Sequence, residues 1–229
     1  MKKLAIFDID YTITKKETLM ELFKYTVKNK KTNIRFLPRA VYCGLMYLIN
    51  VYDEKKVKET FLKFIDKIKE EDLSVLVKNF YNDRLKNILY KDAVDMMKKL
   101  KNEGYDIYLI SASPEFYVKE FYAIKEVDKI IGTKFKFDNG VFSRKMDGEN
   151  CKGEEKVKRL KSYLKENNIG RATFFPLDVI KPNNIAVNFK ESYMFSDSLS
   201  DKPLLDLVGK PYLINYKKKY NSIKILNWK

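Results

Sequence analysis

Asp8 and Asp10 end the first apolar stretch of the chain, in the segment FDIDYTIT. Because side chains alternate between the two faces of a strand, both carboxylates point to the same side, where like charges repel. A solvated turn after the strand would tolerate the pair. A divalent cation would also hold it together, and Mg²⁺, which takes one or two carboxylates together with water and phosphate oxygens, suits such a site. The pair alone leaves both interpretations open.

The composition limits the chemistry. Histidine is absent from the 229 residues, which excludes Ser-His-Asp triads, Cys-His pairs and imidazole acid–base catalysis. The two cysteines, Cys43 and Cys151, lack CxxC spacing, so neither a zinc knuckle nor a disulfide framework is expected. A general acid must therefore be a carboxylic acid or a weaker group, and a reducing, cytoplasmic location is predicted.

The positive charge does not by itself indicate a nucleic-acid partner. The formal net charge is +15, but the lysines are spread along the whole chain and no nucleic-acid-binding motif accompanies them. A positive field would help to attract a phosphorylated substrate. Acidic residues interrupt the N-terminal apolar stretch too early for a secretory signal. The longest apolar span, residues 40–52, is too short for a transmembrane segment and reads as a buried or interfacial helix.

The pattern of apolar residues predicts an α/β core with a helical insertion. Residues 2–10 read as a buried strand, whereas apolar residues between 17 and 100 recur with the helical period. After Gly104, a strand to Ser111 is followed by a helix from Pro114. The remaining expectations are a hairpin around DNG within residues 128–146, a helix over 152–170 ending at Gly170, and strand, acidic loop, helix and strand over 191–216.

Strands that alternate with helices predict a doubly wound, Rossmann-like parallel sheet. Residues 1–15 and 88–229 are predicted to form this core domain, and residues 16–87 to form an inserted all-helical cap domain. Ligands of such sheets bind beyond the carboxyl ends of the strands. Asp8, Asp10, Ser111 and Asp197 all follow or end predicted strands, so one common site is expected.

Four short motifs occur in a fixed order: DIDYT from Asp8, LISAS around Ser111, KGEEK from Lys152, and SDSLSD with Asp197 and Asp201. In this order the chain resembles a haloacid dehalogenase superfamily phosphatase of subfamily IB, the branch that includes phosphoserine phosphatase. The resemblance covers essentially the whole chain, including the helical insertion, which is where this branch carries its cap.

The resemblance implies a Mg²⁺-dependent phosphomonoesterase. Asp8 would be the nucleophile and form an aspartyl-phosphate, while Asp10 would protonate the leaving oxygen and later deprotonate water. Ser111 would bind a phosphoryl oxygen. Mg²⁺ would be bound by Asp8, the backbone carbonyl of Asp10, and Asp197. Asp201 would orient a metal-bound water or the catalytic lysine, although it also fits as the N-cap of the following helix.

Two lysines compete for one role. Lys152 precedes Gly153 as in phosphoserine phosphatases, and Lys156 fits the GxxK spacing of other members of the branch. About one turn of helix would separate them, so they could share a face. Lys152 is slightly preferred.

Substrate selection is expected in the cap. Glu17 occupies the place where phosphoserine phosphatases keep an acid that meets the substrate amine, but it also suits the first turn of a helix. Arg39, and less so Arg35, could meet a carboxylate or a second phosphate. The other residues of the first two motifs that are expected to contact substrate are Thr12, Ala112 and Ser113.

A second set of cap residues bears on the class of substrate. Leu45, Met46, Leu48 and Ile49 form an apolar stripe that is expected to be cap core, although a lipid-phosphate substrate would also need such a surface. The expected substrate is a small phosphorylated metabolite resembling phosphoserine. The alternatives are a lipid phosphate such as phosphatidylglycerophosphate, and a catalytically idle binding protein with the same fold.

The chain departs from the family pattern in two places. Tyr11 replaces the small residue often found before the threonine of the first motif, which would narrow the site. Residues 171–190 lengthen the usual link to the fourth motif. An extra hairpin, a lid and an oligomer contact are all compatible with this segment.

Overall fold

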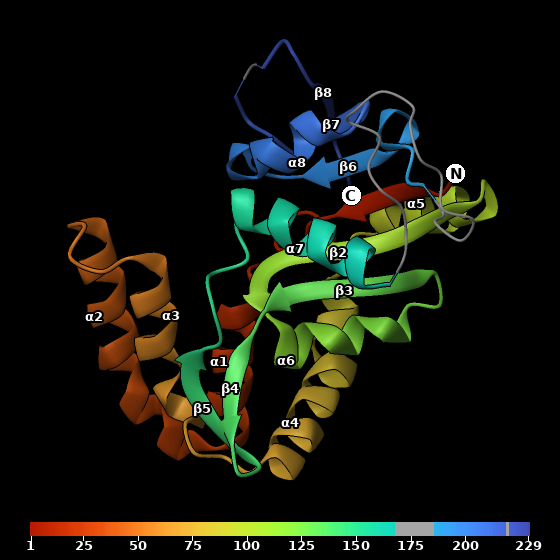
Figure 1. Cartoon of the computed structure of the whole chain (residues 1–229). Coiled ribbons are helices and arrows are strands. Elements are labelled where there is room, and N and C mark those ends of the chain that lie inside the picture. The colour runs from red at the N-terminus through yellow and green to blue at the C-terminus, as the bar shows by residue number, and fades with distance from the viewer. Residues whose placement is uncertain (168–185, 219) are drawn as a thin grey trace.

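A parallel sheet forms the centre of the molecule in a computed structural model that describes residues 1–167, 186–218 and 220–229. The sheet has six strands in the order β3-β2-β1-β6-β7-β8 (Figure 1). Its strands are β1 (Lys3–Phe7), β2 (Tyr105–Pro114), β3 (Val127–Thr133), β6 (Tyr193–Ser196), β7 (Lys210–Ile214) and β8 (Lys224–Leu226). All of the strand pairs are parallel. The predicted doubly wound α/β class is confirmed.

Strand β1 shows why the sheet is covered on both faces. Ala5 and Phe7 belong to one buried cluster, and Leu4 and Ile6 to another on the opposite face. A strand that is buried on both faces is apolar throughout, as in KLAIF. The helices that pack on the two faces are α5 (Lys91–Asn102) with the first cluster, and α7 (Glu154–Glu166) with α8 (Lys202–Leu207) on the second.

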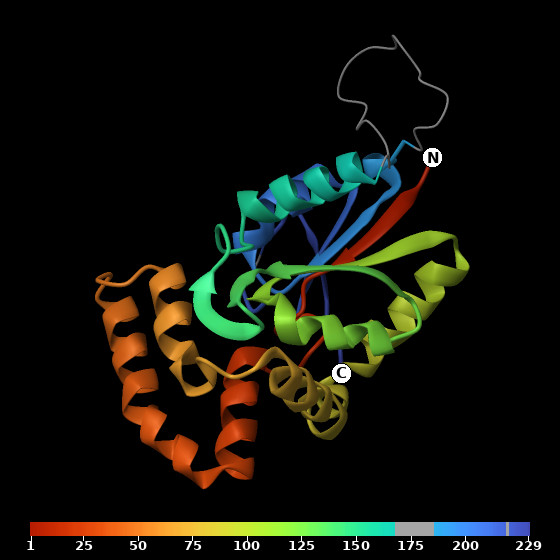
Figure 2. The same ribbon diagram turned by 60° about the horizontal axis from the view of Figure 1, so that its bottom comes forward.

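The segment between β1 and α5 is helical, as predicted. Its helices are α1 (Thr18–Asn29), α2 (Leu37–Leu48), α3 (Glu54–Phe61) and α4 (Glu70–Asp83), with the 3-10 turns η1 (Lys31–Phe36), η2 (Leu62–Ile65) and η3 (Leu85–Ile88). Helices α2 and α3 form an arm that projects to one side of the sheet (Figure 2). No helix among the described residues is long and apolar enough to cross a bilayer.

The expected hairpin occupies only part of its predicted range. Strands β4 (Phe135–Asp138) and β5 (Val141–Met146) pair across Asn139 and Gly140, whose φ values of 50° and 72° suit a two-residue hairpin turn. The preceding residues form β3, which pairs with β2 in the main sheet. Local alternation does not reveal this pairing, because it joins two separate segments of the chain.

The hairpin, which the predicted domain bounds assign to the core, contacts the helical segment. The backbone N–H of Lys67 donates to the carbonyl of Phe142, and that of Phe142 donates to the carbonyl of Ile68. Lys69 and Val141 form an isolated bridge. The two strands therefore extend the helical cap with a small sheet.

The apolar stripe on α2 is not cap core, contrary to expectation. Leu45, Leu48 and Ile49 are 53%, 75% and 60% exposed. Helix α2 turns the opposite side, with Cys43, into the protein. The helix contacts little besides α3 and η1, so nothing among the described residues covers its outer side.

The remaining described elements are the short helix α6 (Glu115–Val118) and the 3-10 turns η4 (Lys119–Ala123), η5 (Phe189–Glu191) and η6 (Leu199–Asp201). Helix α7 ends at Glu166 with Asn167 as its C-cap. The predicted helix end at Gly170, and the unassigned link up to residue 185, lie outside the described residues. From Val187 the chain runs beside Lys2.

Candidate active site

The predicted site residues meet at one edge of the sheet. Strands β2 and β3 direct their carboxyl ends towards the cap arm (Figure 1). A cavity of about 430 Å³ lies between these strand ends and the cap. Its lining consists of Asp8, Asp10, Tyr11, Glu17, Tyr47, Glu54, Val57, Lys58, Ser111, Ala112, Ser113, Lys152, Lys156, Asp197, Ser198, Ser200 and Asp201.

Asp8 follows β1 and is held by its backbone, because its N–H donates to the carbonyl of Phe195 on the neighbouring strand β6. Its side chain is buried. Burial raises the pKa of the Asp8 carboxyl, and the nearby carboxylates of Asp201 and Asp10 raise it further, while Lys156 counteracts them. An ionised Asp8 therefore requires positive charge close to it.

Lys156 supplies part of this charge. Its Nζ lies 2.6 Å from Oδ1 of Asp8 and 2.7 Å from Oδ2 of Asp201, and all three side chains are largely buried. Burial acts to lower the pKa of Lys156, but attraction to the two carboxylates outweighs it and raises the pKa above its usual value. The two carboxylates therefore favour the charged form of the ammonium group and hold it between the first and fourth motifs.

Asp201 is oriented towards Lys156 rather than towards helix α8. It occupies the N-cap position of α8, but its side chain makes no capping hydrogen bond. Its Oδ2 accepts hydrogen bonds from Lys156 and from the hydroxyl of Ser196. Of the roles considered for Asp201, the geometry favours orientation of the lysine.

Asp10 is fixed by the start of the cap. The backbone N–H of Thr18, the first residue of α1, donates to its Oδ1 at 2.7 Å, and the hydroxyl of Ser113 donates to its Oδ2. The hydroxyl of Thr18 in turn lies within hydrogen-bond distance of Ser113 and Tyr117. The carboxylate of Asp10 is therefore held facing the cavity by both the core and the cap.

Asp197 faces the same cavity and is tied to the first motif. Its backbone N–H donates to the buried hydroxyl of Thr12 at 2.8 Å. Thr12 is fully buried and is not part of the cavity lining. Burial, with repulsion from Asp201 and Asp10, raises the pKa of Asp197 to about 6.

The residues present suit Mg²⁺. Among the described residues no group of three or more acidic, cysteine or histidine side chains forms a metal cage. Mg²⁺ does not need one, because it is commonly held by one or two carboxylates and completes its octahedron with water and phosphate oxygens. Asp8 and Asp197 are carboxylates whose pKa values are raised by burial and negative neighbours, so a bound cation would favour their ionised forms.

The second motif contributes a rigid strand end. Ser111 is buried, and its Oγ accepts a hydrogen bond from the backbone N–H of Ser113. The carbonyl of Ala112 accepts hydrogen bonds from Lys58 and Thr133. All three predicted residues of this motif line the cavity.

Lys152, the preferred lysine of the sequence analysis, does not contact Asp8. Its ammonium group pairs with Glu54 of α3, across the boundary between core and cap. Burial acts to raise the pKa of Glu54, but Lys152 and Lys58 outweigh it and hold the pKa below its usual value. Lys152 therefore joins core to cap, and Lys156 is the lysine beside the predicted nucleophile.

Glu17 caps helix α1 and faces the cavity. It is the N-cap of α1, where its carboxylate accepts hydrogen bonds from the N–H groups of Leu19 and Met20. It also lines the cavity. Burial, with repulsion from Asp10, raises the pKa of Glu17 to about 7.

Sequence reasoning missed Lys58. Its Nζ reaches from α3 to the carbonyl of Ala112 at 2.7 Å and to Oδ1 of Asn150 at 2.8 Å. Burial lowers the pKa of Lys58, while Glu54, Asp10 and Glu17 counteract this shift. Since α3 carries several lysines, no sequence signal separated this one. Arg39, which was predicted to contact substrate, is exposed on α2 and is not part of the cavity lining.

Comparisons with known proteins identify the family. Residues 5–206 match the family model described as haloacid dehalogenase-like hydrolase. The chain is 19% identical over 216 residues to an "Inhibition of morphological differentiation protein" of Streptomyces azureus, covering 92% of this chain and 71% of the relative. It is 21% identical over 215 residues to a "Probable phosphatase" of Mycobacterium tuberculosis, covering 92% and 68%.

Solved structures share the fold. A protein of unknown function from Bordetella pertussis superposes with a TM-score of 0.82 at 19% identity, covering 99% of this chain and 98% of the other. A substrate-bound phosphoserine phosphatase complex gives a TM-score of 0.61 at 16% identity, covering 95% and 88%. The resemblance inferred from the four motifs is confirmed at the level of the family.

Proposed function

Because the chain belongs to the haloacid dehalogenase-like hydrolase family, we propose that it is a Mg²⁺-dependent phosphomonoesterase that uses Asp8 as its nucleophile. One observation carries the proposal. The buried ammonium group of Lys156 bridges Asp8 and Asp201 in a cavity that Asp10 and Asp197 also line. Such a cluster of ionisable groups in a concave site is typical of an active site.

In the first step, an oxygen of the Asp8 carboxylate attacks phosphorus as the bond between phosphorus and the leaving oxygen breaks. Asp10 donates its proton to that leaving oxygen, so the product departs as an alcohol. Ser111 and Lys156 stabilise negative charge on the phosphoryl oxygens. The result is an aspartyl-phosphate on Asp8, which divides one difficult hydrolysis into two easier steps.

In the second step, the ionised Asp10 accepts a proton from water while the water oxygen attacks phosphorus. The bond between phosphorus and Asp8 breaks, which releases inorganic phosphate and restores the carboxylate. The hydrogen bonds from Thr18 and Ser113 keep Asp10 in place for both proton transfers. Mg²⁺, held by Asp8, the backbone carbonyl of Asp10 and Asp197, would neutralise charge on the phosphoryl group.

The proposed substrate is a small phosphorylated metabolite that resembles phosphoserine. Glu17 and Lys58 line the same cavity with opposite charges, and these complement an amine and a carboxylate on one substrate. The cavity volume of about 430 Å³ suits a small molecule. Similarity to phosphoserine phosphatase structures supports this choice. The free cysteines Cys43 and Cys151 support a cytoplasmic location. No nucleic-acid partner is proposed, because the lysines are spread along the whole chain.

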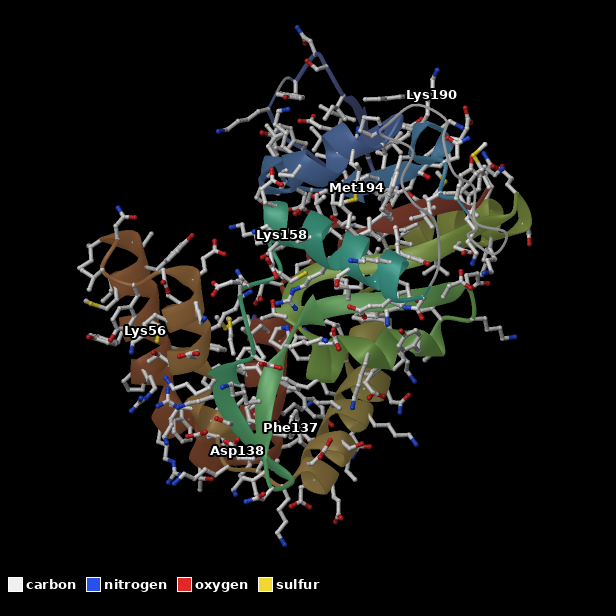
Figure 3. All side chains as sticks on the ribbon, in the orientation of Figure 1. Lys56, Phe137, Asp138, Lys158, Lys190 and Met194 are labelled. Carbon is white, nitrogen blue, oxygen red and sulfur yellow. The ribbon has the colours of Figure 1, made fainter. Side chains whose placement is uncertain are left out.

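The test is phosphate release from a generic aryl phosphate and from phosphoserine, with Mg²⁺ or with chelator. Asp8→Asn should abolish release, whereas Asp138→Asn, on the exposed hairpin (Figure 3), should not. Glu17→Gln should selectively slow release from amine-bearing esters. Mg²⁺-independent release, or equal rates for wild type and Asp8→Asn, would contradict the proposed mechanism. No release from any ester by folded, Mg²⁺-loaded wild type would favour a binding protein instead.

A further inference from the structure

Helix α2 and the turn before it expose a continuous apolar stripe. Its residues are Ile34, Leu37, Val41, Leu45 and Leu48, which are 59%, 48%, 56%, 53% and 75% exposed. They recur at intervals of three or four residues, which is the spacing of one face of a helix. Elsewhere on the cap, an exposed large apolar side chain such as Val75 of α4 stands alone. Single exposed apolar residues are ordinary, but a contiguous apolar face indicates an interaction site.

The stripe lies at the outer edge of the molecule. Helix α2 forms the far side of the cap arm, away from the sheet, in both ribbon views (Figures 1 and 2). Lys56 marks the same arm in Figure 3. The helix packs mainly against α3 and η1, so its outward face is free to meet a flat partner.

The charge at the η1 end of the stripe has one sign. No acidic residue occurs between Glu21 and Asp53. The exposed basic residues at that end are Lys30, Lys31 and Arg35, in η1 and at the residue before it. An apolar helical face with cations at one end suits the interface of an anionic bilayer. A second copy of the chain docked with the same end against the first would bring these like charges together, which opposes self-association.

The same helix leads to the cavity. Tyr47 lines it and donates a hydrogen bond from its hydroxyl to Glu54, the residue that pairs with Lys152. A surface that binds α2 would therefore also contact the helix that carries Tyr47, a residue of the cavity wall.

We propose that the outer face of α2, with the preceding turn η1, docks the protein onto the surface of an anionic lipid bilayer. The apolar stripe enters the boundary between headgroups and acyl chains, and Lys30, Lys31 and Arg35 meet the lipid phosphates. The protein lies on the bilayer and does not cross it, which agrees with the short length of α2. This binding goes beyond the proposed function and does not depend on catalysis.

The test is co-sedimentation of the full chain with vesicles of phosphatidylcholine, alone or mixed with phosphatidylglycerol. Wild type should sediment with the mixed vesicles and much less with phosphatidylcholine alone. The double variant Leu45→Gln, Leu48→Gln should weaken binding at least about tenfold, because two apolar anchors are lost. The matched control Val75→Gln should bind like wild type. Circular dichroism and unchanged hydrolysis of a soluble ester would show that the variants are folded.

The charge contribution is tested separately. Lys30→Gln, Lys31→Gln should weaken binding to mixed vesicles more than Lys78→Gln, Lys86→Gln, a pair of the same net charge change on α4 and η3. Three results would overturn the proposal: wild type that stays in the supernatant, binding that the Leu45, Leu48 variant does not weaken, or equal losses for the two lysine pairs. A dimer in sedimentation equilibrium that only the leucine variant abolishes would assign the face to a second copy and likewise overturn it.

Discussion

Lys156 and Lys152 differ in role because of where helix α7 begins. Gly153 is the N-cap, with a φ of 55°, and the helix starts at Glu154. Lys152 therefore precedes the helix. The two lysines would share a face only if one continuous helix carried both of them. The left-handed backbone at Gly153, which glycine adopts without steric cost, separates the two side chains. One points to Asp8 and the other to the cap.

The first prediction compares these lysines. Lys156→Met should lower kcat for phosphate release at least about a hundredfold, because it removes a fixed donor to the phosphoryl group. It should also lower the free energy of unfolding by about 3–5 kcal/mol, since two buried carboxylates lose their partner. Lys152→Met, which breaks a partly exposed pair, should cost about 1 kcal/mol or less. Steady-state kinetics measures kcat, and urea unfolding measures the free energy of unfolding. An equal loss of kcat in the two variants would refute the assignment of Lys156 as the lysine that acts on the phosphoryl group.

The second prediction concerns Glu17. Its pKa is about 7 in the folded protein and 4.5 for the unperturbed group. The folded state therefore binds more protons than the unfolded state in this interval, so Glu17 reduces stability as the pH rises from about 4.5 to 7. Glu17→Gln removes this loss. Its melting temperature relative to wild type should rise across the interval and then level off.

The measurement is thermal unfolding in chelator at several pH values. Glu71→Gln, on the exposed first turn of α4, is the control and should parallel wild type at every pH. A Glu17→Gln curve that also stays parallel to wild type would contradict the raised pKa. Glu17→Gln also removes a charged N-cap of α1. This lowers the free energy of unfolding by about 1 kcal/mol at every pH, so it shifts the curve without changing its slope.

At the scale of elements, connections were harder to predict than helices and strands. The periodicity of α1, α4, α5 and α7 is strong, and each lies within its predicted range. The pairing of β3 with β2 was missed because it depends on contacts between distant segments. The backbone at Gly209, just before β7, also lies against the backbone of η5. There, the N–H of Gly209 donates to the carbonyl of Phe189.

The third prediction uses this approach. A Cβ at Gly209 would lie 1.9 Å from the backbone oxygen of Lys190, so Gly209→Ala should lower the free energy of unfolding by about 2–4 kcal/mol. Gly44, inside α2, has open space around it. Gly44→Ala should raise that free energy by about 0.5–1 kcal/mol through helix propensity. Chemical denaturation measures both, and a neutral Gly209→Ala would contradict the packing described between η5 and β7.

At the scale of the whole molecule, the site joins residues of the sheet with residues of the helical segment. Core strands supply Asp8, Ser111 and Asp197, whereas cap helices supply Glu17 and Lys58. Polar contacts cross between the units, including Lys152 to Glu54 and Lys55 to Glu149. Ligands that bind this site should therefore stabilise the entire fold.

The fourth prediction follows from that linkage. A saturating concentration of Mg²⁺, about a hundred times its dissociation constant, should stabilise the folded chain by about 2.7 kcal/mol and raise the melting temperature by roughly 5–10 °C relative to chelator. Asp197→Asn should lose most of this shift, whereas Asp138→Asn should keep it. Differential scanning calorimetry provides the measurement. An equal shift in all three proteins would place Mg²⁺ outside the proposed site.

The sequence by itself determined the family, the parallel α/β class, the helical insertion and the grouping of Asp8, Asp10, Ser111 and Asp197 at one edge. The family follows from the resemblance that the four motifs carry. The fold class and the insertion follow from local periodicity, and the grouping follows from the rule that polar residues at the ends of parallel strands share one edge of the sheet. Tertiary structure alone decided which lysine faces Asp8, that Lys58 enters the cavity, and that α2 is exposed. Each depends on contacts between segments far apart in the chain, and an apolar helix has the same pattern whether a protein core or another surface covers it.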